Sequence, residues 1–283
     1  MAVILDGNAL SKKVREDVRV EIEKTGLDAG LAVIIVGDDP ASRVYVNAKK
    51  KDCEVCGIRS EEFPLAADVG EKAILDLIDT LNNRSDINGI LVQLPLPKGY
   101  DEEKIIQAVS PDKDVDAFNF VNVGRIMKGD FNFLPCTPAG VMEMLDHYEI
   151  DIKGKHCVVV GRSDIVGKPQ AMLLLHRHGT VSICHSRTPD LGVITRQADI
   201  LVAAVGKVNI ITADMVKPGA VVIDVAMNQN AEGKLCGDVD FKAVEPIASY
   251  ITPVPGGVGP MTRAVLMKNT LTAAKLAAGL KNN

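Results

Sequence analysis

Hydrophobic residues recur along the first third of the chain in two alternating patterns. Leucine, valine and isoleucine occupy every fourth position from Leu10 to Ile22, ahead of Gly26, which predicts an amphipathic helix with a glycine stop. The unbroken apolar run from Leu31 to Val36 predicts a buried strand of a parallel sheet. The two patterns then repeat, and we expect helices near 41–56, 73–81 and 101–109 and strands near 58–63 and 88–92.

The alternation returns in the second half, after a stretch at 110–135 where it lapses and where we expect a domain boundary. Thr137 and Pro138 are typical of a helix N-cap and a first helical residue. The stretch 252–260 is rich in proline and glycine and predicts irregular structure, followed by one long helix from Met261 to about Leu280. Further strands are expected near 156–160, 180–184, 199–203 and 220–225. Strands that alternate with helices predict βαβ units, and therefore an α/β fold with a mostly parallel sheet.

Composition excludes several classes of protein. The 283 residues are 47% hydrophobic and 24% charged, which suits one large or two ordinary globular domains and excludes wholesale disorder. A net charge of −5 and 4% aromatic residues without Trp argue against a nucleic-acid partner, although a local basic pocket stays open. No apolar run approaches the roughly 18 residues of a membrane span, and Asp6 comes too early for a secretory signal. We therefore expect a cytoplasmic protein with no membrane partner.

The six cysteines are expected to be reduced thiols. Cys53 and Cys56 form a lone CxxC pair, whereas a zinc ribbon needs a second ligand pair at suitable spacing, which this sequence does not contain. We interpret the pair as helix packing and expect no metal.

A strand, a glycine-containing turn and a helix follow one another at 156–175, which is the context of a dinucleotide site. Gly161 permits the tight turn and Gly167 permits close packing of helix on strand, whereas Ser163 replaces the second glycine of the usual GxGxxG motif. The free N–H groups of the helix N-terminus suit a pyrophosphate. For this segment alone, a purely structural turn remains open.

The end of the next strand bears on the choice between NADP and NAD. NAD enzymes usually place an acidic residue about twenty residues past the turn, where it binds the ribose 2′-hydroxyl. This chain has Ser186 and Arg187 there, and Arg187 can clamp a 2′-phosphate with Arg162 assisting. We therefore predict NADP as the cofactor; a solvated surface position is the alternative for Arg187.

Candidate catalytic side chains lie in the first half of the chain. Tyr45 and Lys49 share a face of the expected helix, where Tyr45 can stack on a flat substrate and a desolvated Lys49 can act as general acid or base. Gln93 directly follows a strand, where α/β sheets bind ligands. A carboxylate of Lys113–Asp116 can accept two N–H bonds from a nitrogen heterocycle. Taken singly, these features are also compatible with an exposed pair, a polar strand end and a solvated acidic turn.

Six segments occur together in a familiar order, and in them the chain resembles the bifunctional methylenetetrahydrofolate dehydrogenase/cyclohydrolase family over nearly its whole length. The segments are Tyr45-Val-Asn-Ala-Lys49, Gly89-Ile-Leu-Val-Gln-Leu-Pro-Leu-Pro97, Lys113-Asp-Val-Asp116, Pro135-Cys-Thr-Pro138, Gly161-Arg-Ser-Asp-Ile-Val-Gly-Lys-Pro169 and Pro253-Val-Pro-Gly-Gly-Val-Gly-Pro-Met-Thr262. Six matches in order are highly specific and outweigh the alternatives for single residues. The resemblance implies NADP-dependent oxidation of 5,10-methylenetetrahydrofolate to 5,10-methenyltetrahydrofolate, followed by hydrolysis to 10-formyltetrahydrofolate, in one-carbon metabolism.

The resemblance also implies roles for individual residues. Lys49 would be the key group in hydrolysis, and Gln93 would hydrogen-bond Lys49 and tune its protonation. Asp116 would anchor the pterin through its ring nitrogens, and Tyr45 would stack on the aminobenzoate ring. Further residues expected to bind folate are Val92, Leu94, Pro255, Gly256, Gly257, Val258 and Gly259, and those expected to bind the cofactor are Gly161, Arg162, Ser163, Ser186, Arg187 and Met227.

The implied architecture is two α/β domains flanking a cleft. A discontinuous folate-binding domain would comprise 1–118 plus 262–283, and a Rossmann-like NADP-binding domain would comprise 136–261. The implied partners are tetrahydrofolate derivatives, as substrates, and a second copy of the chain in a homodimer.

Three positions depart from the family pattern. Ala117 and Ala226 stand where glycine is usual, beside the expected pterin and cofactor sites, and Arg263 stands where an apolar residue is usual, so that it faces either solvent or an anionic group. Three other functions remain open: a dehydrogenase without cyclohydrolase activity, a catalytically silent folate or NADP sensor, and a generic NADP dehydrogenase of a small acid. The presence of Lys49 argues against the first two.

Overall fold

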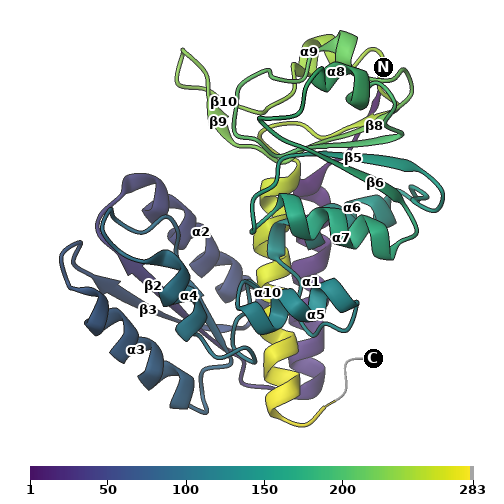
Figure 1. Ribbon diagram of the computed structural model, residues 1–283. Coiled ribbons are helices and arrows are strands. Elements are labelled where there is room, and N and C mark those ends of the chain that lie inside the picture. Colours follow the sequence, from purple (N-terminus) through teal and green to yellow (C-terminus); the bar gives the residue numbers. More distant parts are fainter. Residues whose placement is uncertain (281–283) are drawn as a thin grey trace. The chain divides into compact units, whose positions relative to one another are not determined.

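A computed structural model of the protein describes residues 1–280 (Figure 1). The chain forms two compact units, the first comprising Met1–Ser11 and Thr137–Thr262 and the second comprising Lys12–Cys136 and the chain from Arg263 onward. The boundary between Ser11 and Lys12 falls inside helix α1 (Gly7–Thr25), and the boundary between Thr262 and Arg263 falls inside helix α10 (Val258–Ala277). Each unit therefore combines segments from distant parts of the sequence.

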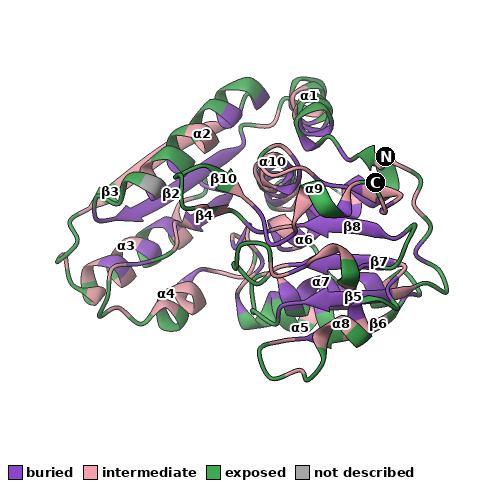
Figure 2. Cartoon of the chain, turned by 90° about the horizontal axis from the view of Figure 1, so that it is seen from above, coloured by how far each residue is buried: buried purple, intermediate pink, exposed green. Residues whose placement is uncertain are grey.

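The second unit is built on a three-stranded parallel sheet in the order β3-β2-β4. Every residue of the central strand β2 is buried, so both faces of the sheet are covered (Figure 2). Ala32, Ile34 and Val36 alternate along β2 and share one hydrophobic core with Ile74 of α3 and Ile105 of α4. The strands of this unit are β2 (Gly30–Val36), β3 (Arg59–Leu65) and β4 (Gly89–Val92), and the helices that lie wholly within it are α2 (Pro40–Cys56), α3 (Glu71–Asn83), α4 (Glu102–Ala108) and α5 (Phe120–Lys128).

The first unit contains a six-stranded parallel sheet in the order β1-β11-β8-β7-β5-β6. Strand β5 has its successor β6 on one side and β7 on the other, so the strand order reverses at β5, and ligands of such sheets bind outside the carboxyl ends of the strands at this point. The strands are β1 (Val3–Ile4), β5 (His156–Val160), β6 (Thr180–Cys184), β7 (Ile200–Ala203), β8 (Val221–Asp224) and β11 (Tyr250–Ile251), with a separate hairpin of β9 (Asn228–Gln229) and β10 (Leu235–Cys236). The helices are α6 (Cys136–His147), α7 (Gly167–His176), α8 (Leu191–Thr195) and α9 (Phe241–Val244), with a 3₁₀ turn at Ala213–Met215.

Most elements expected from periodicity are confirmed, including β2, the four longer strands of the first unit and α1 with its stop at Gly26, which has a φ of 66°. The CxxC pair also packs as expected: Cys53 and Cys56 are buried on α2. Burial raises the pKa of both thiols to about 12, so neither is a ready thiolate ligand.

The segment at 110–135 differs from expectation because it contains α5. The side chain of Asn119 caps this helix by accepting from the Val121 N–H, and Gly129 ends it with a φ of 76°. Its apolar residues Phe120, Val123 and Met127 recur at helical spacing, as in an amphipathic helix, but they lie on an exposed face.

Two other boundaries also differ. Thr137 lies inside α6 rather than capping it, and its hydroxyl is 2.9 Å from the hydroxyl of Thr262. Helix α10 begins at Val258, so the end of the proline- and glycine-rich stretch is helical. Residues 1–11, which we placed in the folate-binding domain, group instead with Thr137–Thr262, because β1 pairs with β11 at the edge of the six-stranded sheet.

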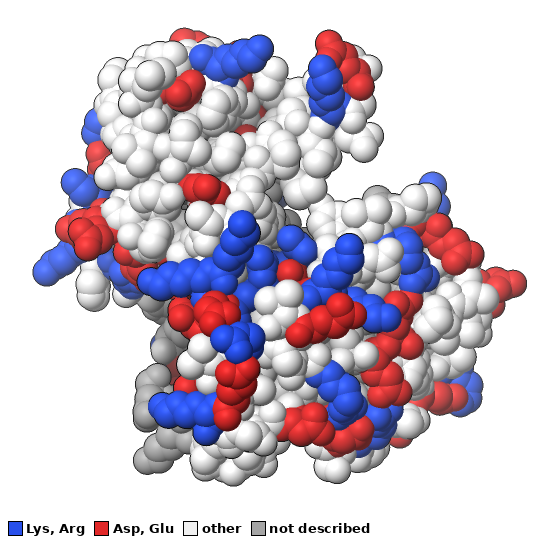
Figure 3. Space-filling view, turned by 180° about the vertical axis from the view of Figure 1, so that it is seen from behind, with Lys and Arg blue, Asp and Glu red and all other residues white. Residues whose placement is uncertain are grey.

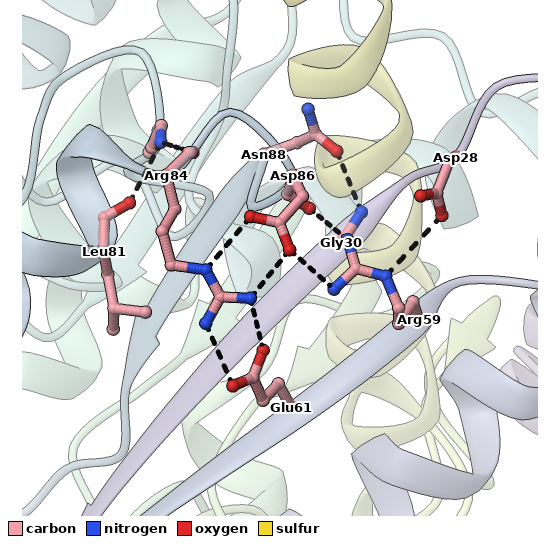
Figure 4. A network of polar contacts seen from close by, with 9 residues as sticks. Asp28, Gly30, Arg59, Glu61, Leu81, Arg84, Asp86 and Asn88 are labelled. Carbon is pink, nitrogen blue, oxygen red and sulfur yellow. Dashed lines mark hydrogen bonds and ion pairs between the residues drawn. The ribbon is translucent and has the colours of Figure 1, made fainter.

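Ion pairs connect the amino ends of the strands in the second unit (Figure 4). Arg84 lies 2.7 Å from carboxylate oxygens of both Glu61 and Asp86, and Arg59 lies 3.3 Å from Asp86 and 3.7 Å from Asp28. These side chains are partly or largely exposed, and such pairs each contribute about 0–1 kcal/mol. We therefore assign the network to the scaffold, at the end of the sheet opposite to the candidate site.

Candidate functional site

The part of the site in the second unit is organised around Lys49 on α2. Tyr45 and Lys49 are four residues apart on one face of this helix. The Lys49 amine donates a hydrogen bond of 2.9 Å to the Oε1 atom of Gln93, which lies immediately beyond β4. The Nε2 atom of Gln93 donates to the Leu94 carbonyl at 2.6 Å, so the amide oxygen is left to accept from the lysine.

The protonation of Lys49 is set by opposing influences. Burial lowers the pKa of the Lys49 amine, and the carboxylate of Asp116 opposes this shift by stabilising the ammonium form. Burial likewise raises the pKa of Asp116, while Lys49 and a hydrogen bond from the Cys136 thiol favour its carboxylate form. A lysine with a depressed pKa is more often neutral near pH 7 than an exposed one, and a neutral amine can accept a proton.

The two aspartates of Lys113–Asp116 have different surroundings. Asp114 is buried and its carboxylate accepts from the Asn119 N–H at 2.7 Å and from the Asn122 amide at 2.9 Å. It therefore holds the chain that leads into α5. Asp116 is half-buried, and its carboxylate interacts with the charge of Lys49 and with the Cys136 thiol.

Ala117 follows Asp116 in a left-handed backbone conformation with a φ of 57°. This conformation favours glycine and strains an alanine, which gives a physical reason for the glycine usual at this position. Ala226 lies in the other unit, where its N–H donates to the Asp224 carboxylate at 3.2 Å; the structure offers no comparable reason for its departure from glycine.

Sequence reasoning missed two buried residues beside Asp116. The Cys136 thiol contacts Asp116, and burial raises the pKa of this thiol well above its ordinary value, so it stays protonated and can donate. Asn269 of α10 donates to the carbonyls of Val115 and Leu134 at 2.8 and 2.9 Å and fixes the backbone next to Asp116. Cys136 belongs to the segment Pro135–Pro138, which carries part of the family resemblance, but only the tertiary structure shows that its thiol contacts Asp116.

The expected cofactor turn in the first unit is built so that only glycine fits. Gly161 follows β5 with a φ of 138°, and a Cβ there would lie 2.3 Å from the Ala204 carbonyl oxygen. A Cβ at Gly167 would lie 2.3 Å from the Gly161 carbonyl oxygen, so the first turn of α7 closes tightly on the strand. Arg162 and Ser163 are exposed. The turn therefore presents backbone to solvent at the point where a pyrophosphate would approach.

We expected the N–H groups at the N-terminus of α7 to be free, but two N–H groups at its start already have a partner. The Ser163 hydroxyl accepts from the Val166 and Gly167 N–H groups at 3.2 and 3.3 Å. The Ser163 hydroxyl thus provides an acceptor for two N–H groups at the start of α7, which glycine could not do.

Ser186 and Arg187 lie at the same edge of the sheet as this turn. Val160 and Cys184 are paired at the ends of β5 and β6, and the Gly161 N–H donates to the Cys184 carbonyl at 2.8 Å. Ser186 and Arg187 follow directly and are exposed. The tight turn and these side chains fit a dinucleotide with a 2′-phosphate, which the guanidinium and the hydroxyl would bind.

The loop that precedes α10 completes the expected site residues of the first unit. Gly256 accepts from the Asn8 N–H at 3.1 Å through its carbonyl, and a Cβ at Gly7 would lie 1.7 Å from the Gly257 carbonyl oxygen. Pro255 is exposed and Val258 is buried. A Cβ at Gly259 would lie 3.3 Å from the Met227 sulfur, which places these two expected ligand residues together.

Within residues 1–280, no group of three or more His, Cys, Asp and Glu side chains is arranged to hold a metal ion. In the same part of the chain, no helix is both long and apolar enough to cross a membrane. Basic and acidic side chains are interspersed on the face shown in Figure 3.

Two family profiles match the chain. The profile described as "Tetrahydrofolate dehydrogenase/cyclohydrolase, catalytic domain" matches residues 5–116, and the corresponding "NAD(P)-binding domain" matches residues 135–278. The chain belongs to the tetrahydrofolate dehydrogenase/cyclohydrolase family. It is therefore an enzyme with a catalytic domain and an NAD(P)-binding domain.

Individual members of the tetrahydrofolate dehydrogenase/cyclohydrolase family match nearly the whole chain. A protein of Acetivibrio thermocellus named "Bifunctional protein FolD" is 57% identical over 99% of both chains. The crystal structure of a bifunctional FolD from Campylobacter jejuni is 48% identical, with a TM-score of 0.95 over 98% of this chain and 99% of that one. A Trypanosoma brucei FolD, solved with NADP cofactor and inhibitor, is 38% identical, with a TM-score of 0.93 over 98% of each chain.

Proposed function

We propose that this member of the family oxidises 5,10-methylenetetrahydrofolate with NADP and then hydrolyses 5,10-methenyltetrahydrofolate to 10-formyltetrahydrofolate. The observation that carries the proposal is the hydrogen-bonded pair of Lys49 and Gln93 beside Asp116, within the segment that matches the catalytic domain. These are the residues to which the sequence resemblance gave the hydrolytic and pterin-anchoring roles.

In the oxidation, the chain positions the substrate rather than supplying a reactive group. Asp116 accepts hydrogen bonds from the pterin nitrogens, and Tyr45, which is 37% exposed, offers a ring face to the aminobenzoate. Val92 and Leu94 are half-buried on either side of Gln93 and supply apolar walls. Bound NADP would supply the acceptor for the hydride that leaves the folate methylene carbon. The protein accelerates this step by holding the two rings in a reactive geometry.

In the hydrolysis, Lys49 moves protons. The methenyl group is cationic, so a neutral Lys49 tolerates it better than an ammonium would. Water adds to the methenyl carbon and its proton passes to the Lys49 amine, while Gln93 orients that amine through their hydrogen bond. The carbon–nitrogen bond at N5 then breaks: the ammonium gives its proton to N5, and the hydroxyl proton of the adduct is released to water as the carbonyl forms. The amine is regenerated and the formyl group remains on N10.

For the cofactor, we propose NADP bound by the Gly161 turn, Ser186 and Arg187, with Arg162 assisting and Met227 contributing backbone. The support is the glycine-only turn and the absence of an acidic residue at positions 185–187, directly after β6.

Replacing Arg187 by alanine is expected to lower kcat/KM for NADP by about 10- to 100-fold, the value of a charge-assisted hydrogen bond to phosphate. The kcat/KM for NAD, which lacks the 2′-phosphate, is expected to stay within about two-fold of the wild-type value. Arg177→Ala is the matched control, because Arg177 is an exposed arginine of the same unit that pairs with Asp146. Equal losses for both cofactors would contradict this role for Arg187.

The function as a whole is tested by an absorbance time course with methylenetetrahydrofolate, run separately with NADP and with NAD. We expect NADPH formation without build-up of the methenyl compound. NADPH formation with accumulating methenyl compound would leave a dehydrogenase lacking its hydrolase. If a folded sample reduces neither cofactor, the sensor and the NADP dehydrogenase of a small acid are the alternatives that remain.

We further propose that the enzyme is a cytoplasmic homodimer whose folate-binding and NADP-binding domains correspond to the second and first units. The dimer rests on the resemblance, and the location is supported by six cysteines that are all free thiols. Sedimentation should give twice the chain mass of 30.2 kDa.

A further inference from the structure

A buried carboxylate lies one helical turn beyond Lys49. Tyr45, Lys49 and Asp52 are spaced four and three residues apart along one face of α2, and Asp52 is 6% exposed. Arg15 of α1 lies 3.3 Å from one carboxylate oxygen of Asp52, and Arg263 of α10 lies 2.9 Å from the other. The anionic group that Arg263 reaches is therefore Asp52.

The packing of α2 on α10 holds this pair in place. The Cys53 thiol lies 3.6 Å from the sulfur of Met267, one turn beyond Arg263 on α10. The side chains of Arg263 and Asp52 are 27% and 9% exposed, so the ion pair is only weakly screened by solvent. The contact of Cys53 with Met267 and the ion pair with Asp52 thus hold the Arg263 guanidinium against the face of α2 that carries Lys49.

The charges in this cluster do not cancel. Two guanidinium groups share one carboxylate, which leaves one positive charge in excess at the face of α2 that carries Lys49. A positive charge disfavours a second ammonium nearby, whereas a carboxylate favours it. Asp116 is the carboxylate on the other side of Lys49.

We propose that Arg263 is a positioning residue for Lys49: held by Asp52, it adds a positive charge to the effect of burial and so favours the neutral, proton-accepting form of the lysine. This inference rests on the proposed function, because it assigns a purpose to the neutral state of Lys49. It also explains how the chain accommodates an arginine where an apolar residue is usual.

The groups that act on Lys49 come from several elements. Asp116 and the thiols of Cys136 and Cys53 favour its ammonium form, whereas burial and Arg263 disfavour it. Gln93 contributes a neutral hydrogen-bond acceptor. Among these groups, Arg263 is the cation whose charge opposes that of Asp116.

Two charge variants test the proposal in opposite directions. Arg263→Met removes the excess positive charge and should raise the titration midpoint of Lys49 by about one pH unit. Since hydrolysis needs the neutral amine, its rate at pH values below the midpoint should fall about ten-fold. Asp52→Asn increases the positive charge and should lower the midpoint by about one unit. The double variant restores the original balance and should titrate close to wild type, as should Arg263→Lys.

The measurement is the pH titration of the Lys49 signal in NMR spectra of protein carrying ¹³C at the lysine Cε, with the signal assigned by its loss in Lys49→Met. The pH profile of hydrolysis is recorded in parallel. Lys275→Met is the control, because it breaks another ion pair of α10 with α1, at 2.7 Å from Glu21, about 18 Å further along the helix. In this control variant the titration midpoint of Lys49 should stay at the wild-type value.

Opposite shifts in the two charge variants support the proposal, and the NMR readout does not depend on hydrolysis. Midpoints that stay unchanged, or that move in the same direction, in folded variants overturn it. If the NMR midpoints shift as expected but the hydrolysis profile does not follow them, the proposed role of Lys49 fails while the inference about Arg263 stands. Should Arg263→Met not fold, the downward shift in Asp52→Asn and its reversal in the double variant still decide the question.

Discussion

Replacing Lys49 by methionine is expected to lower the cyclohydrolase rate by about 10²- to 10⁴-fold, the contribution of a positioned general acid–base. The dehydrogenase is expected to retain at least about a tenth of its rate, because hydride transfer depends on ring alignment and needs no proton acceptor. In the absorbance assay, the variant should therefore form NADPH and accumulate the methenyl compound.

Methionine preserves the length and the unbranched shape of lysine, so the variant should fold. The variant loses the hydrogen bond from the Lys49 amine to Gln93 Oε1, which should lower the free energy of unfolding by about 1 kcal/mol. Lys51→Met is the matched control: it removes an exposed lysine from the same helix, two residues away, and should leave both activities unchanged. Cyclohydrolase activity that survives in Lys49→Met would refute the assignment of Lys49 as the acid–base group.

Local signals predict the scaffold of the site well. The apolar run of β2 and the four-residue spacing in α1 report burial directly, because strands and helices repeat with different periods. Strands of two residues, such as β1 and β11, are too short to show any period. Helix α5 was missed although its signals are in the sequence: Phe120, Val123 and Met127 recur at helical spacing, and Asn119 and Gly129 are recognisable start and stop signals.

Within the site, sequence alone could indicate the residues that a strand end or a helix face brings forward, such as Gln93 and Lys49. It could not separate Asp114 from Asp116, because only the hydrogen bonds of Asp114 show which carboxylate is committed to the fold. Nor could it pair Asp52 with Arg263, since 211 residues separate them and the contact exists only when α2 packs on α10. Buried charges acquire their meaning from partners that no local pattern encodes.

Replacing Gly161 by alanine is expected to produce the opposite separation of activities from Lys49→Met. The added Cβ would lie 2.3 Å from the Ala204 carbonyl oxygen, and a φ of 138° strains any L side chain. The turn must shift, so the KM for NADP should rise by at least about ten-fold, and the dehydrogenase should fall with it. Hydrolysis of added methenyltetrahydrofolate, which uses Lys49 in the other unit, should stay within about two-fold of wild type.

Gly154→Ala separates backbone strain from the clash. Gly154 precedes the same strand β5 and has a φ of 73°, but a Cβ there would meet no atom within 4 Å. This variant carries a φ penalty of about 1 kcal/mol at the other end of the strand and should bind NADP as the wild type does. If Gly161→Ala and Gly154→Ala weaken NADP binding equally, the effect comes from general strain in the sheet. If Gly161→Ala alone does so, the close approach of Gly161 to Ala204 is what shapes the turn for the cofactor.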